Sequence, residues 1–153
     1  MSDERSLIDA NVLVYALYAD AEQHTSSRRL LDAASRGEAL LCVTSQVLAE
    51  FFSIVTSPKR VSIARTPQEA ISAIESILTL RGVKVLPSPD TVPGLWIDLL
   101  RRRPVSAARV FDLQLVATML ANSVRTIYTF NRRDFEVFPE LEVRTPAVEV
   151  QSS

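Results

Sequence analysis

Apolar side chains along the chain follow two periods, one typical of buried strands and one typical of helices with a single apolar face. Short apolar runs predict five strands, at residues 6–9, 39–44, 83–86, 126–130 and 141–144. Patterns of helical period predict helices between them, at residues 12–18, 22–36, 45–56, 66–81, 91–103 and 107–122. Strands that alternate with helices predict an α/β fold of three layers, in which a mostly parallel central sheet is flanked by helices.

Helix ends carry local signals that support these boundaries. Gly37 follows one predicted helix and Gly82 follows another, and glycine commonly ends a helix. The helix over 66–81 begins with Thr66 and Pro67 and has Glu69 three residues after the threonine, the pattern of a capping box. We therefore expect reciprocal hydrogen bonds between Thr66 and Glu69.

Length and composition narrow the class of protein. A chain of 153 residues with 47% hydrophobic and 23% charged residues predicts one globular domain over 1–153. The net charge of -1 does not favour general attraction to nucleic acid. A single cysteine, Cys42, excludes a disulfide framework and a cysteine-rich zinc site. The polar start and the lack of a long apolar run predict a soluble, cytoplasmic protein without a membrane partner.

Four acidic residues are candidates for a functional site because of their positions in the predicted strands and helices. Asp9 ends the first predicted strand and Asp134 follows the strand over 126–130, so parallel strands would bring both to one edge of the sheet. Glu50 and Asp112 interrupt strongly apolar helices, where a carboxylate is costly unless something pairs with it. Several carboxylates at one point repel each other, and a bound dication removes that repulsion.

The ligand types favour Mg²⁺, which prefers oxygen ligands, and Mn²⁺ as its substitute. His24 is the only histidine, so a histidine-rich zinc or iron site is excluded. Each acid also has a simpler interpretation. Asp9 would cap the helix after it, Glu50 and Asp112 would pair with arginines such as Arg109, and Asp134 would be an ordinary loop acid.

The motifs around these acids resemble the PIN-domain family, and specifically the VapC toxins of bacterial toxin–antitoxin pairs. The opening motif is similar to residues 7–15, the glutamate motif to 44–51, the next aspartate motif to 111–118 and the last motif to 128–135. Four motifs in order cover nearly the whole chain. One departure is Asn131, where many relatives carry aspartate, so the resemblance leaves open whether Asn131 or Asp134 contacts the metal.

The resemblance implies an Mg²⁺-dependent endoribonuclease with Asp9, Glu50, Asp112 and Asp134 as catalytic and metal-binding residues. It implies the toxin of a type II toxin–antitoxin system, a VapB-like antitoxin as partner, and cleavage of a structured RNA such as a tRNA or rRNA loop. A homodimer is also expected, with contacts around Phe51 and Phe52 or over 71–77. The alternatives are a non-catalytic PIN-like RNA-binding protein and a housekeeping PIN ribonuclease without an antitoxin.

Further polar residues near the motifs are candidates for supporting roles. Hydrogen bonds that orient the carboxylates are expected from Asn11, Thr44, Ser45, Thr129 and Asn131. For Thr44 and Ser45, local capping of the next helix is the alternative. Arg132 and Arg133 are candidates for contacts with the RNA backbone. The aromatic residues Tyr15, Tyr18, Phe51 and Phe52 are interpreted as core or dimer contacts rather than as base-stacking residues.

Overall fold

The computed structural model describes residues 4–147, which contain a sheet of five strands with every neighbouring pair parallel. The spatial order of the strands is β3-β2-β1-β4-β5. Their bounds are β1 (Ser6–Ile8), β2 (Leu41–Val43), β3 (Val83–Val85), β4 (Thr126–Tyr128) and β5 (Glu142–Arg144). All five predicted strands are present, each shorter than its apolar run, so the predicted parallel sheet is confirmed.

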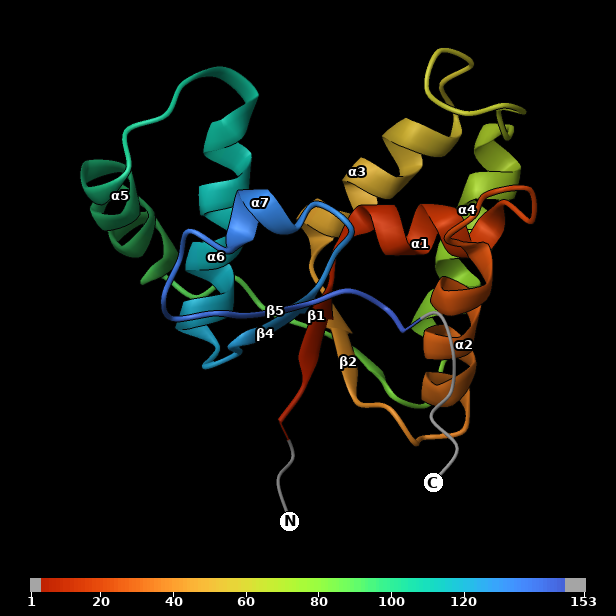
Figure 1. Ribbon diagram of the computed structural model, residues 1–153, viewed down its shortest axis with the longest axis horizontal. Coiled ribbons are helices and arrows are strands. Elements are labelled where there is room, and N and C mark those ends of the chain that lie inside the picture. The colour runs from red at the N-terminus through yellow and green to blue at the C-terminus, as the bar shows by residue number, and fades with distance from the viewer. Residues whose placement is uncertain (1–3, 148–153) are drawn as a thin grey trace.

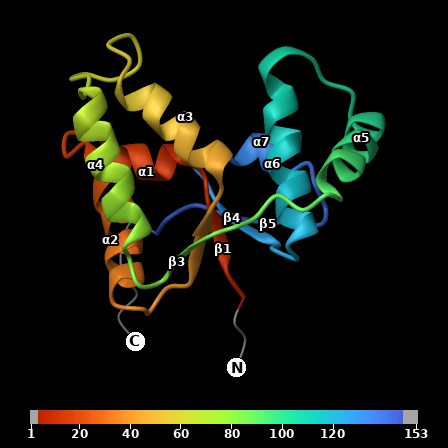
Figure 2. The ribbon, with the colours of Figure 1, turned by 180° about the vertical axis from the view of Figure 1, so that it is seen from behind.

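Within residues 4–147, seven α-helices flank this sheet, which confirms the predicted α/β architecture. They are α1 (Ala10–Leu17), α2 (His24–Ser35), α3 (Ser45–Val55), α4 (Pro67–Leu78), α5 (Val92–Arg102), α6 (Val110–Ala121) and the short α7 (Arg132–Phe135). Figures 1 and 2 show α1 to α4 gathered on one side of β1 and α5 with α6 on the other. Within residues 4–147, no helix has the length and apolar character needed to cross a bilayer.

The core consists of the central strands and the apolar faces that pack on them. Leu7, Ile8, Val43 and Ile127 have at most 1% of their surface exposed. Parallel strands that are covered on both faces read as continuous apolar runs, which is why these strands were visible in the sequence.

Gly37 and Gly82 are required to be glycine for different structural reasons. Gly37 has φ of 74° after α2, and its N–H donates to the Ala34 carbonyl, as expected of a residue that ends a helix. Gly82 is not the residue that ends α4, because α4 already ends at Leu78. A Cβ on Gly82 would lie 2.1 Å from the Ala39 carbonyl oxygen, so close packing against the segment before β2 requires glycine there.

Several predicted helix boundaries were wrong, and one short helix was missed. The helix expected over 22–36 begins at His24, because residues 20–23 form turns. The helix expected over 107–122 starts as a 3₁₀ turn, η1 (Ala107–Arg109), before α6, and Ala107 there has φ of 56°. The sequence analysis also missed α7, whose four residues are too few to produce a helical period. The capping box of Thr66 and Glu69 is confirmed.

The order in which successive strands are added to the sheet reverses at its centre, beside β1. From β1 the chain proceeds outward through β2 to β3, and then crosses back to β4 on the other side of β1. In open parallel sheets, ligands bind beyond the carboxyl ends of the strands at such a reversal. A functional site is therefore expected at the residues directly after β1 and β4.

Candidate functional site

Asp9 follows β1 at this reversal and is fixed by three hydrogen bonds. Its Oδ1 accepts from the Ala10 N–H at 2.8 Å, so Asp9 does cap α1. Its Oδ2 accepts from the Thr129 hydroxyl at 2.7 Å and from the Asn11 amide at 3.2 Å. Only 6% of Asp9 is exposed. The capping interpretation is therefore correct, and it leaves the carboxylate at the sheet edge where a site is expected.

Thr129 and Asn11 tie the end of β4 to the end of β1. The Thr129 hydroxyl also accepts from the Asn131 N–H at 2.9 Å, and the Asn11 Oδ1 accepts from the Phe130 N–H at 3.1 Å. Thr129 is fully buried. Both residues thus hold Asp9 and the start of the loop that carries Asp134, in the orienting position expected of them.

The other three acids reach the same region from α3, α6 and α7. Burial raises the pKa of Asp9, the charge of Asp134 raises it further, and the hydrogen bonds from Thr129 and Ala10 oppose the rise. Burial raises the pKa of Asp112 to about 6, with added effects from Asp134 and Asp9. These mutual effects require that the carboxylates be near one another.

Glu50 belongs to the same electrostatic group. Partial burial raises the pKa of its carboxyl, and the charges of Asp9 and Asp112 raise it further. The guanidinium of Arg60 opposes this rise. The structure therefore brings together all four acids that the sequence placed in one site.

Ion pairing does not explain these acids. Among residues 4–147 none of Asp9, Glu50, Asp112 and Asp134 forms a salt bridge. Arg109 lowers the pKa of Asp112 through its charge but does not pair with it. The interpretation of Glu50 and Asp112 as structural ion pairs with arginine is thus not what the described residues show.

The spacing of the acids bears on which cation would fit. In the described part of the chain, no three His, Cys, Asp or Glu side chains are gathered tightly enough to hold an ion by themselves. Like charges without a counter-ion favour such separation. Mg²⁺ requires only one or two direct carboxylates and keeps several waters, so a loose group of oxygen ligands suits it. The residues present fit a hydrated divalent cation.

The remaining predicted site residues differ in their surroundings. Thr44 caps α3 by accepting from the Val47 N–H at 3.0 Å, and Ser45 is exposed. Neither has a hydrogen bond to the four carboxylates within the described residues, so local capping describes Thr44. Arg132 is paired with Glu136, whereas Arg133 is exposed with its guanidinium unpaired among residues 4–147.

Two of the expected dimer contacts, Phe51 and Ile77, need correction. Phe51 is 1% exposed and Ile77 is 7% exposed, so both belong to the core of the chain and cannot contact another copy. On α4, Ile71, which lies within the expected range 71–77, is 44% exposed, and Leu78 is 42% exposed. The sequence pattern could not separate inward from outward apolar positions on α4, because the helix is apolar on more than one face.

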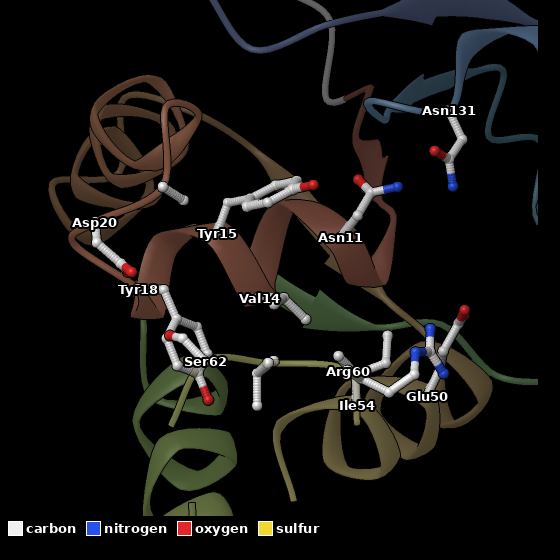
Figure 3. Close-up of a pocket in the computed structure, with 12 residues that line it drawn as sticks. Asn11, Val14, Tyr15, Tyr18, Asp20, Glu50, Ile54, Arg60, Ser62 and Asn131 are labelled. Carbon is white, nitrogen blue, oxygen red and sulfur yellow. The ribbon is translucent and has the colours of Figure 1, made fainter. Parts of the chain in front are cut away.

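The sequence analysis missed a cavity beside the acids and one residue in it. The cavity has a volume of about 380 Å³ and lies between α1, α3 and the loop after α3, as Figure 3 shows. Glu50, Asn11 and Asn131 line one end of it, and Arg60 lines it from the loop. Arg60 carries no motif or period, and only its place after the glutamate helix could have suggested it.

Comparison with known proteins shows the family to which the chain belongs. The model of the PIN domain family matches residues 6–141, and the chain belongs to that family. It is 35% identical over 139 residues to Ribonuclease VapC43 of Mycobacterium tuberculosis, covering 91% of this chain and 93% of that protein. It is 25% identical over 132 residues to Ribonuclease VapC24 of the same organism, covering 86% and 89%. The resemblance found in the motifs is confirmed.

Solved structures share the fold. VapBC2 from Rickettsia felis, bound to a DNA fragment from its promoter, superposes with a TM-score of 0.66 at 18% identity, covering 92% of this chain and 97% of that chain. VapC20 of Mycobacterium tuberculosis, described as a Sarcin-Ricin loop cleaving toxin, gives 0.60 at 17% identity, covering 88% and 97%. At these identities the likeness establishes the three-dimensional arrangement only.

Proposed function

We propose that this protein is a divalent-metal-dependent endoribonuclease, the toxin of a type II toxin–antitoxin pair acting in the cytoplasm. The observation that carries the proposal is the group of four mutually repelling carboxylates, Asp9, Glu50, Asp112 and Asp134, at the reversal point of a parallel sheet. The names of the similar VapC ribonucleases support it. None of the four carboxylates forms a salt bridge within residues 4–147, and a dication would stabilise such a group of charges.

Mg²⁺ is the proposed cation, with Mn²⁺ as a substitute. Asp9, Asp112 and Asp134 would hold it directly or through water, with Glu50 at the exposed side. The bound ion would supply an activated water and stabilise negative charge on the scissile phosphate. The chain contributes the fixed position of Asp9, because Ala10, Asn11 and Thr129 already satisfy the hydrogen bonds that orient it.

RNA is the proposed substrate, as an unpaired loop of a structured RNA such as tRNA or rRNA. Sequence-specific proteins read RNA mostly at unpaired bases, and a site at the surface end of a sheet is open to such a loop. Arg133 has no partner within residues 4–147 and is the better candidate of the two predicted arginines for the RNA backbone, because Arg132 is engaged by Glu136.

Cleavage of labelled RNA by the purified full chain tests the proposal. We expect cleavage with Mg²⁺ or Mn²⁺, none with excess EDTA, and full activity after removal of zinc. The Asp112→Asn variant, shown to be folded by circular dichroism, is the matched inactive control. RNA binding without cleavage in either metal would identify a non-catalytic RNA-binding protein instead, and full activity in EDTA would exclude the metal site.

A VapB-like antitoxin is the proposed protein partner. The structures of VapBC pairs among the neighbours support this partner. An arginine of the antitoxin would neutralise the four acids and compete with the metal. Coexpression with the product of the neighbouring gene tests it, and we expect a stable complex without ribonuclease activity. A free protein that is harmless to its host and copurifies with no small partner would leave a housekeeping PIN ribonuclease.

A homodimer completes the proposal. With Phe51 and Ile77 assigned to the core, the exposed apolar residues of α4, Ile71 and Leu78, are the candidate contacts. Sedimentation of the chain and of an Ile71→Glu variant tests this, with dissociation of the variant as the expected result.

A further inference from the structure

The cavity continues from the acidic site, because Glu50 belongs to both. Its wall combines apolar side chains of α1 and α3, among them Val14 and Ile54, with the aromatic ring of Tyr15. Its polar groups include Asn11, Glu50 and Asn131 at the end beside the acids, together with Arg60, Asp20 and Ser62. The cavity therefore combines apolar surface with several polar groups that a ligand could contact, and its volume of about 380 Å³ lies within the usual range of ligand pockets.

The two ends of the cavity face different parts of the molecule. Figure 3 shows Glu50, Asn11 and Asn131 toward one end, with Asp20 and Ser62 at the opposite end. Glu50 is coupled electrostatically to Asp9 and Asp112. A ligand that fills the cavity therefore has one end beside the proposed cleavage site and the other end at Asp20.

The far wall of the cavity is held in place before any ligand arrives. The Tyr18 hydroxyl donates to the Ile63 carbonyl at 2.9 Å, and the Arg65 N–H donates to the Val55 carbonyl at 2.7 Å. The Arg65 guanidinium lies 4.9 Å from the centre of the Tyr18 ring. These contacts fix the loop that carries Arg60 and Ser62 against α1 and α3, so binding would require little ordering of this wall.

The ring of Tyr15 is fixed in a similar way. It meets the ring of Phe130 edge to face, with centroids 5.2 Å apart and an angle of 89° between the planes. Tyr15 is half-buried, so part of its surface remains available to the cavity. Tyr15 was interpreted as a core or dimer contact, and its packing against Phe130 agrees with a partly buried position beside the cavity.

Arg60 is the one cation among the described residues that line the cavity. Its charge acts on Glu50, and its guanidinium forms no salt bridge within residues 4–147. An arginine beside an acidic site has a planar set of donors for phosphate or for the acceptor edge of a base. Asp20, at the other end, offers only acceptors, which suit a base edge with paired N–H donors.

From this arrangement we propose that the cavity binds the unpaired base next to the scissile phosphate, with guanine preferred. The inference rests on the proposed function and names the nucleotide that this site selects. Arg60 lies where the nucleotide enters beside Glu50, and Asp20 and Ser62 bind the edge of the base. Guanine fits because its N1–H and N2–H present two adjacent donors to the Asp20 carboxylate, whereas adenine, cytosine and uracil do not.

Mononucleotides test the cavity without any cleavage step. The probes are the four nucleoside 5′-monophosphates, with ribose 5-phosphate as the probe that lacks a base, and the readout is the NMR signals of the Val14 and Ile54 methyl groups. We expect guanosine monophosphate to shift these signals at concentrations about 10-fold lower than the other nucleotides. Equal shifts from ribose 5-phosphate, or no shift from any nucleotide, would overturn the inference.

Cleavage-site mapping on a random single-stranded RNA pool supplies the second test. We expect guanine at one position next to the cut for the wild type, and at least about 10-fold weaker preference in Asp20→Asn and Ser62→Ala. Arg36→Gln, which alters an exposed arginine paired with Glu38 outside the cavity, is the control and should keep the preference. Unchanged preference in both cavity variants would overturn the inference while leaving the ribonuclease proposal intact, whereas no cleavage by the wild type would overturn both.

Discussion

Two parts of the acidic site are built in opposite ways. The Asp9 corner, formed by buried Asp9 and Thr129 and half-buried Asn11, is linked by hydrogen bonds and joins the ends of two neighbouring strands. The helix-borne acids, Glu50 and Asp112, extend from α3 and α6 and have no hydrogen bond or salt bridge to their carboxylates within residues 4–147. Hydrogen bonds fix the carboxylate of Asp9, whereas only the positions of α3 and α6 place those of Glu50 and Asp112.

The difference indicates that the two parts have separate roles in binding a cation. A carboxylate with satisfied hydrogen bonds keeps its position whether or not a cation is present. Carboxylates without partners are raised in pKa by burial and by each other's charge, and a cation reverses that effect. We infer that the Asp9 corner defines where the cation sits, and that the helix-borne acids supply the charge that attracts it.

The largest expected effect comes from removing a carboxylate charge from either part. Asp9→Asn and Asp112→Asn should each lower the rate of RNA cleavage about 1,000-fold or more, because each removes part of the charge that the cation requires. The measurement is the single-turnover rate at saturating Mg²⁺. A folded variant of either kind that cleaves at the wild-type rate would remove that residue from the site.

A smaller effect is expected from loosening the Asp9 corner without changing its charge. Thr129→Val removes the hydroxyl that donates to Asp9 at 2.7 Å, and should lower the cleavage rate about 10- to 100-fold. Thr118→Val is the matched control, since Thr118 is also buried but donates only to the Gln114 carbonyl within α6. Equal rates for the two variants would mean that the corner does not position Asp9.

A third variant separates positioning from simple helix capping. Thr44→Ala removes the cap of α3, which should lower the free energy of unfolding by about 1 kcal/mol and the melting temperature by about 2–4 °C. Thr44→Ser keeps the capping hydroxyl and should keep the stability. We expect the cleavage rate of folded Thr44→Ala to change less than about 3-fold, far less than that of Thr129→Val. A loss as large as that of Thr129→Val would place Thr44 in the site.

The contrast between the two parts also explains what the sequence could predict. Glu50 and Asp112 were found because a carboxylate among apolar helical neighbours breaks a regular period. Asp9 and Asp134 were found because parallel strands deliver their ends to one edge of a sheet. These signals depend on short stretches of chain, and the burial of Leu7 and Ile127 on the same strands follows from the same patterns.

Sequence patterns could not show which of the expected orienting hydrogen bonds form, or where the cavity lies, because both depend on contacts between distant segments. The hydrogen bond from Thr129 to Asp9 joins residues 120 positions apart, and Thr44, which has the same side chain beside another motif, makes only a local bond. The cavity at Arg60 exists because the loop after α3 folds back on Tyr18 of α1. No period or motif in one segment records such a meeting, so sequence patterns named the acids but not the wall beside them.

The smallest expected effect concerns the stability of the metal-free protein as pH changes. The pKa of Asp112 is about 6 in the folded chain and 3.8 as its ordinary value, with burial as the main cause and Asp134 and Asp9 as further causes. A raised pKa means that the folded state disfavours the charged carboxyl, so the cost is absent below about pH 4, grows as pH rises, and is complete above about pH 6.

Asp112→Asn should therefore stabilise the metal-free protein at pH 7.5, by about 1 kcal/mol after allowance for solvent screening of this half-exposed group, or about 2–4 °C in melting temperature. The gain should shrink steadily as the pH falls from 6 toward 4, and Mg²⁺ at pH 7.5 should raise the melting temperature of the wild type more than that of the variant. A gain that is the same at pH 4.5 and pH 7.5 would show that repulsion and burial of the Asp112 charge are not its cause.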